Sequence, residues 1–132
     1  MGAEPIDPRV IELAGRVFDL ARDGATGELC DYLAAGVPVD LTNDKGDTLL
    51  ILAAYHRHPV TVAALLERGA DPARVNDRGQ TALAAAVFRQ SEEAVTALLA
   101  AGADADAGGQ SARATAAFFD LPAMTALLDA GA

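Results

Sequence analysis

The sequence predicts an all-α fold, a solenoid of about four helix-turn-helix repeats joined by short hairpin loops. Three observations support this prediction. Short segments recur along the chain at a fixed offset, and each recurring unit holds two apolar runs separated by a polar break. The third observation is the composition, in which 52% of the 132 residues are hydrophobic but only 5% are aromatic, with no Trp. A core of Ala, Leu and Val suits closely packed helices.

The repeat is clearest in segments that recur 33 residues apart. Residues 64–71 (ALLERGAD) match residues 97–104 (ALLAAGAD), and residues 43–48 (NDKGDT) match residues 76–81 (NDRGQT). Near the end, 126–132 matches 97–103 at the shorter offset of 29. The prediction is therefore a single domain divided into an N-terminal capping repeat (7–42), two regular repeats (43–75 and 76–108) and a shortened C-terminal repeat (109–132).

Each regular repeat begins with the signals of a short first helix. Thr48 and Thr81 precede the apolar runs 49–55 and 82–88. A Thr at such a place caps a helix, because its hydroxyl accepts a backbone N–H from the first turn. We therefore expect the first helices to occupy these two runs.

A second helix follows each polar break. Pro59 suits the first position of a helix, with a histidine side chain capping it, and Ser91 followed by two glutamates is a favourable N-cap. Gly69 and Gly102 should end these helices in the left-handed conformation. Such a helix pair cannot bury its apolar side alone, so the repeats must stack into one continuous core.

The N-terminal stretch 8–23 predicts an amphipathic capping helix that starts at Asp7-Pro8 and ends at Gly24. Its apolar face is expected to consist of Val10, Leu13, Val17 and Leu20.

The repeating unit resembles the ankyrin repeat, and the resemblance extends from about Gly24 to the end of the chain. It rests on 46–48 (GDT) and 69–71 (GAD), with their counterparts 79–81 (GQT) and 102–104 (GAD). The family's usual Thr-Pro-Leu-His is replaced by TLLI at 48–51 and TALA at 81–84, so its Pro and His are absent. The resemblance implies a protein-interaction module that binds through hairpin tips and the concave face of its first helices.

Transferred to this sequence, the resemblance implies two groups of partner-binding residues. They are Asp44, Lys45, Asp47, Asp77, Arg78 and Gln80 at the hairpin tips, and Tyr55, His56, Phe88, Arg89, Phe118 and Phe119 at the ends of the first helices. Tyr55, Phe88 and Phe118 hold equivalent places in successive repeats. We expect their rings to form a row with a spacing of about 10 Å, one helix diameter. The row is either exposed to a partner or packed between repeats.

The charge of the chain restricts the class of partner. A net charge of −9 repels phosphate backbones and anionic lipids, so neither nucleic acid nor a membrane surface is an expected partner, whereas a protein with a basic surface is compatible. The first ten residues, MGAEPIDPRV, show no signal-peptide pattern, and the location expected is cytoplasmic. The Ala- and Arg-rich, Lys-poor composition suggests a bacterial source.

Two alternatives to a binding module remain open. His56 and His58 could hold a metal or serve an enzyme only with further ligands, and no catalytic or cofactor motif accompanies them, so the expectation is no enzyme, no cofactor and no metal. The last repeat is apolar, and it either packs inward in a monomer or pairs with a second copy in a homodimer. The residues concerned are Phe118, Phe119, Leu121, Met124, Leu127 and Leu128.

Overall fold

The computed structural model describes residues 8–131, and this part of the chain forms eight α-helices. They are α1 (Pro8–Asp23), α2 (Thr26–Ala34), α3 (Leu49–Tyr55), α4 (Pro59–Glu67), α5 (Ala82–Phe88), α6 (Glu92–Ala100), α7 (Ala112–Phe118) and α8 (Pro122–Ala130). The all-α prediction is confirmed, and α3 and α5 have the bounds expected of the first helices. Asp7 and Ala132, which begin and end the predicted terminal repeats, lie outside the described residues.

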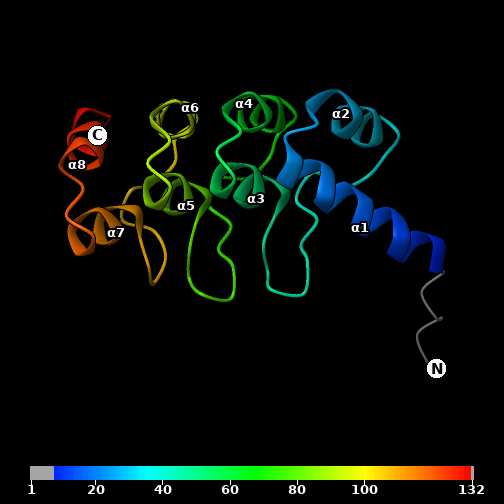
Figure 1. Cartoon of the computed structure of the whole chain (residues 1–132), viewed down its shortest axis with the longest axis horizontal. Coiled ribbons are helices and arrows are strands. Elements are labelled where there is room, and N and C mark those ends of the chain that lie inside the picture. Colours follow the sequence, from blue (N-terminus) through cyan, green and yellow to red (C-terminus); the bar gives the residue numbers. More distant parts are fainter. Residues whose placement is uncertain (1–7, 132) are drawn as a thin grey trace.

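The helices form two rows (Figure 1). The helices α1, α3, α5 and α7 stack in an inner row, and α2, α4, α6 and α8 stack behind them in an outer row. The loops that precede α3, α5 and α7 project away from the outer row. This arrangement is the predicted solenoid of four helix pairs, with the core between the rows.

The first helices begin with the predicted hydroxyl caps. The Oγ1 atoms of Thr48 and Thr81 accept the backbone N–H groups of Ile51 and Ala84, each at 3.1 Å. Ser111 caps α7 in the same way. These bonds satisfy backbone donors that a helix leaves unpaired at its start.

The second helices begin without such caps. Pro59 is in the first turn of α4, as predicted, but the side chains of His58 and Ser91 make no capping bond. The expectation that a histidine caps α4 is therefore wrong. The Nε2 atom of His58 instead donates to the carbonyl oxygen of Arg22, at 2.7 Å, and satisfies the end of α1. A Cβ atom on Gly24 would lie 2.5 Å from this imidazole, so a glycine is needed there.

Burial is most complete in the two central inner helices. All residues from Leu49 to Ala54 in α3, and all from Ala82 to Val87 in α5, are buried. Each of these helices packs against an inner helix on both sides and against an outer helix. Small Ala side chains let the helices approach closely enough to leave no solvent-exposed face there.

The predicted apolar face of α1 is only half correct. Val17 and Leu20 are buried, but Val10 and Leu13 are 55% and 37% exposed. The physical reason is length, because α1 has 16 residues and its inner neighbour α3 has only 7. The first half of α1 extends beyond the helices that could cover it.

The C-terminal helix follows a different register from the one the sequence match indicates. Leu128 is fully buried, as Leu65 and Leu98 are in α4 and α6, so α8 repeats α6 at an offset of 30 and not 29. Gly102 follows α6 with the predicted positive φ of 88°, whereas Gly131 caps α8 with a φ of −85°. Packing of the buried leucine, and not the position of the glycine, sets the register.

Candidate functional site

The predicted tip residues gather around one groove. The groove is lined by side chains of α1 and α3 and of the hairpin loops before α3 and α5, and it has a volume of about 700 Å³. Its lining is made of Arg22, Asn43, Asp44, Lys45, Asp47, Ile51, Leu52, Tyr55, His56, Asp77, Arg78 and Gln80. All six predicted tip residues are in this set, together with Tyr55 and His56 from the end of α3.

Asparagines fix the shape of the two hairpin tips. The Oδ1 atom of Asn43 accepts the N–H groups of Lys45 and Asp47 at 2.9 Å. Asn76 makes the equivalent pair of bonds in the next hairpin. The backbone N–H of Asp77 also donates to the carbonyl of Lys45 at 3.0 Å. Because these bonds hold the backbone on both sides, the tips present their side chains from a fixed edge.

Asp47 does not belong to the exposed tip. Its side chain is buried, and its Oδ1 atom accepts a 2.9 Å hydrogen bond from Nδ2 of Asn76. The expectation that Asp47 is exposed for a partner is wrong, because its carboxylate ties the first hairpin to the second. Sequence reasoning missed Asn76 as the residue that joins the two hairpins. The sequence signals this position only through the recurring Asn-Asp turn, which does not indicate a buried contact.

Four aromatic rings form a connected chain, here called the aromatic chain, made of Tyr55, Phe88, Phe119 and Phe118. The rings of Tyr55 and Phe88 stack with their centroids 6.1 Å apart. Phe88 meets Phe119 edge-on at 5.2 Å, and Phe119 meets Phe118 at 4.9 Å. The expected spacing of about 10 Å is thus wrong for Tyr55 and Phe88. In the last repeat, the ring that contacts Phe88 belongs to Phe119 and not to Phe118, the residue at the equivalent position. The chain turns at Phe119, where α7 ends.

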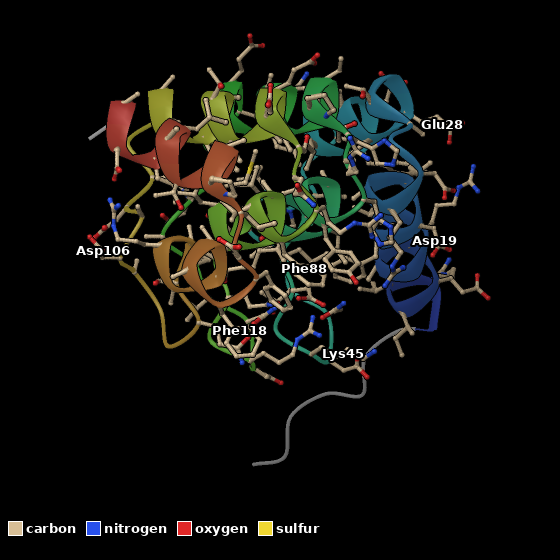
Figure 2. The ribbon with its side chains drawn as sticks, turned by 60° about the vertical axis from the view of Figure 1, so that its left-hand side comes forward. Asp19, Glu28, Lys45, Phe88, Asp106 and Phe118 are labelled. Atoms are coloured by element: carbon tan, nitrogen blue, oxygen red, sulfur yellow. The ribbon has the colours of Figure 1, made fainter. Side chains whose placement is uncertain are left out.

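The aromatic chain is open to solvent along its C-terminal half. Phe118, Phe119 and Phe88 are 82%, 51% and 38% exposed, whereas Tyr55 is half-buried. Phe118 and Phe119 line a second hollow of about 390 Å³ beside α7. Figure 2 shows Phe88 and Phe118 on the same side of the molecule as Lys45. The rings therefore pack against one another between repeats and also face outward.

Two half-buried side chains, Arg89 and His56, lie beside the aromatic chain. The guanidinium carbon of Arg89 lies 5.1 Å from the centre of the Tyr55 ring, a cation–π contact. The ring of His56 meets Tyr55 edge-on at 5.2 Å. Burial, followed by the charges of His58 and Arg89, lowers the pKa of His56 below its usual range. The folded chain therefore disfavours protonation of His56 relative to a free imidazole.

The two histidines make different contacts. His58 is engaged by the carbonyl of Arg22, whereas His56 contacts the ring of Tyr55. Within residues 8–131, no group of three His, Cys, Asp or Glu side chains is placed to hold a metal ion.

The apolar residues of the last repeat mostly pack inward. Met124 and Leu128 are buried, and Leu121 and Leu127 are half-buried, so only Phe118 and Phe119 of this set face solvent. None of the helices within residues 8–131 is long and apolar enough to cross a membrane.

Comparisons with known proteins agree with the repeat pattern. The family described as "Ankyrin repeats (3 copies)" matches residues 18–108, which is well over half of the chain. A Pseudomonas aeruginosa protein described as an ankyrin repeat protein is 46% identical over 57 residues. This match covers 43% of the chain and 33% of the relative, so the chain spans about a third of that protein's length.

Proposed function

Because the chain belongs to the ankyrin repeat family, whose members generally mediate protein–protein interactions, we propose that it binds a partner protein through its groove and aromatic chain. The observation that carries the proposal is the connected row of rings along the ends of α3, α5 and α7, in which the three Phe rings are exposed. A folded chain gains nothing from leaving two adjacent Phe side chains in water, and exposed apolar patches typically mark interaction sites.

The geometry of the face favours tight contact. The rings of Phe88 and Phe119 brace one another at 5.2 Å, so binding does not have to immobilise freely rotating side chains. Large aromatic residues and Arg are the types that dominate binding energy at protein interfaces. Arg89 is held over Tyr55 beside this row. The proposed contact residues are the aromatic chain together with Asp44, Lys45, His56, Asp77, Arg78, Gln80 and Arg89.

The overall charge and the apolar end bear on the kind of complex. The net charge of −9 favours long-range attraction of a partner with a basic surface. The inward packing of Met124 and Leu128 favours a monomer over a homodimer paired through the last repeat. We propose no catalytic role, because the face presents no nucleophile paired with a base and no metal-ligand set within the described residues.

Affinity capture with surface variants tests the proposal. The double variant Phe118→Ala/Phe119→Ala removes the two most exposed rings and leaves the core intact. We expect it to capture the partner at least about tenfold less well than the unchanged chain, because interface aromatics each contribute about 1–2 kcal/mol or more.

The matched control is Val60→Ala, which removes an exposed apolar side chain from α4 in the outer row. We expect this variant to capture the partner normally. Thermal unfolding followed by circular dichroism should give similar midpoints for all three proteins. Equal capture by the double variant and the unchanged chain would contradict the proposed face.

A further inference from the structure

The residues that follow α5 and α7 reach back to the aromatic ring of the preceding repeat. Arg89 follows α5 and places its guanidinium carbon 5.1 Å from the centre of the Tyr55 ring. Phe119 follows α7 and meets the ring of Phe88 at 5.2 Å. In each case a side chain of the next repeat contacts the ring, and the contacting group is either a guanidinium or another ring.

Phe118 holds the position equivalent to Tyr55 and Phe88, but no later residue reaches back to its ring. It is 82% exposed, and its one ring contact among the described residues is with its neighbour Phe119, at 4.9 Å and an interplanar angle of 79°. The two rings therefore form a corner, and they line a hollow of about 390 Å³. An occupant of this hollow would contact a ring that the fold itself leaves uncovered.

The charges around the hollow favour a cation. The lining itself is uncharged, but Asp120, directly after Phe119, is exposed and forms no ion pair with another described residue. Between residues 101 and 131 the chain holds four aspartates against one arginine, and this arginine is already paired with two of them. The neighbouring groove adds no net repulsion, because its lining holds as many aspartates as Lys and Arg.

An arginine side chain suits both the rings and the charges. The face of an aromatic ring carries partial negative charge, so it attracts a guanidinium, which also stacks flat on the ring. The fold already uses this contact where Arg89 lies over Tyr55. An aliphatic or aromatic side chain would bury the same rings, but the surrounding carboxylates would add nothing to its binding. Charge therefore selects the guanidinium among the groups that could contact the corner.

We propose that the hollow at Phe118 and Phe119 takes an arginine side chain of the partner protein. The guanidinium lies on the ring of Phe118, and the carboxylate of Asp120 balances its charge. The contact is the intermolecular equivalent of the one between Arg89 and Tyr55. The inference rests on the proposed function and adds the chemistry of the group that is bound at this end of the face.

Differential selection of linear peptides tests the inference. A random peptide display library is selected on the intact chain, and peptides that also bind Phe118→Ala/Phe119→Ala are removed. The peptides that remain need the two rings, and we expect them to carry Arg. Replacing this Arg by citrulline, which has nearly the same shape but no charge, should weaken binding about threefold to fivefold in fluorescence anisotropy.

Two variants show which protein groups bind the cation. Phe118→Leu keeps an exposed apolar side chain but removes the aromatic face, so it should weaken the Arg peptide about threefold and leave the citrulline peptide unchanged. Asp120→Asn should weaken the Arg peptide about twofold, because an exposed ion pair contributes little. Asparagine tolerates the positive φ of 52° at this position, so the turn is retained.

The matched control for Asp120→Asn is Asp31→Asn, which makes the same change of charge at an exposed position on α2. We expect this control to bind the Arg peptide as the unchanged chain does. An equal loss in both variants would show that net charge alone attracts the peptide, and it would overturn the role of Asp120.

The other outcomes separate this inference from the proposed function. Ring-dependent peptides without Arg, or a citrulline peptide that binds as tightly as its Arg parent, would overturn the cation and leave the proposed face standing. The inference is also overturned if no ring-dependent peptide is found, and capture of the partner by the double Phe variant then decides the proposed face separately. Normal capture by that variant would count against both.

Discussion

The two central helix pairs and the two ends of the chain follow the same sequence plan but differ in packing. In α3 and α5, six consecutive residues are buried in each helix. In α7, the equivalent helix of the last repeat, only Ala112, Thr115 and Ala116 are buried. At the other end, the first half of α1 leaves Val10 and Leu13 in solvent. The same repeat is therefore a core element in the middle and a boundary at the ends.

The ends replace apolar contacts with polar ones. Arg113 occupies the place of the buried Leu83 and contacts Asp106 at 3.0 Å and Asp129 at 2.6 Å. Terminal repeats of a solenoid have a neighbour on one side only, so their outer face must be compatible with water. Phe118 and Phe119 depart from this pattern. Their exposure is the reason to regard this part of the boundary as functional.

The largest expected difference between middle and end concerns the buried leucines. Leu98 in α6 and Leu128 in α8 are both fully buried, but only Leu98 has a repeat on each side. We expect Leu98→Ala to lower the free energy of unfolding by about 3–4 kcal/mol and Leu128→Ala by about 2 kcal/mol, since the end can relax around the cavity. Urea unfolding measures both, and equal losses would contradict the distinction.

The hairpin asparagines offer a smaller contrast. Asn76 is buried and bonds its own turn as well as Asp47, whereas the bonds of Asn43 stay within its own hairpin. We expect Asn76→Ala to cost about 2–3 kcal/mol, because it leaves the buried carboxylate of Asp47 unsatisfied, and Asn43→Ala to cost about 1 kcal/mol. Thermal unfolding of the two variants under identical conditions decides the order. A larger loss for Asn43→Ala would refute the bridging role of Asn76.

The polar end is tested by restoring the apolar residue of the central repeats. Arg113→Leu removes two exposed ion pairs, so we expect stability to change by less than about 1 kcal/mol. The variant should instead self-associate, because it exposes an apolar end to a second copy. Light scattering over a range of concentrations measures the self-association. Arg68→Leu, at the C-terminal end of α4, is the control. A strictly monomeric Arg113→Leu would show that this arginine does not act as a solubilising cap.

The smallest expected effect is a pH dependence from the central part of the face. Burial lowers the pKa of His56 in the folded chain, so the unfolded chain takes up this proton first as the pH falls below about 6.5. Stability attributable to His56 is complete above that pH and decreases on acidification, and the decrease should be small because the ring is only partly buried. Unfolding midpoints between about pH 7 and pH 5 should fall less for His56→Gln than for the unchanged chain. An identical decrease in the unfolding midpoint of both proteins would show that His56 does not contribute to the pH dependence.

The sequence predicts the periodic part of the fold well because local signals repeat there. The Thr caps, the apolar runs and the turn glycines place α3 and α5 at their observed bounds. The ends are harder to predict, because burial of Val10 or Leu128 depends on the neighbours that the solenoid provides. The register of the repeats predicts the residues of the proposed face. It does not predict the contacts of Phe119 with Phe88 and of Asp47 with Asn76, because these form between repeats and have no local signal.

We propose that the groove and the aromatic chain together form the binding face. Hydrogen–deuterium exchange of the chain, free and saturated with the captured partner, tests it most directly. We predict slower exchange on binding at residues 43–47, 55–56, 76–80, 88–89 and 118–119, with no change in the outer helices α4 and α6. Slower exchange confined to α4 and α6, with the hairpin tips and the ends of α3, α5 and α7 unaffected, would contradict the account.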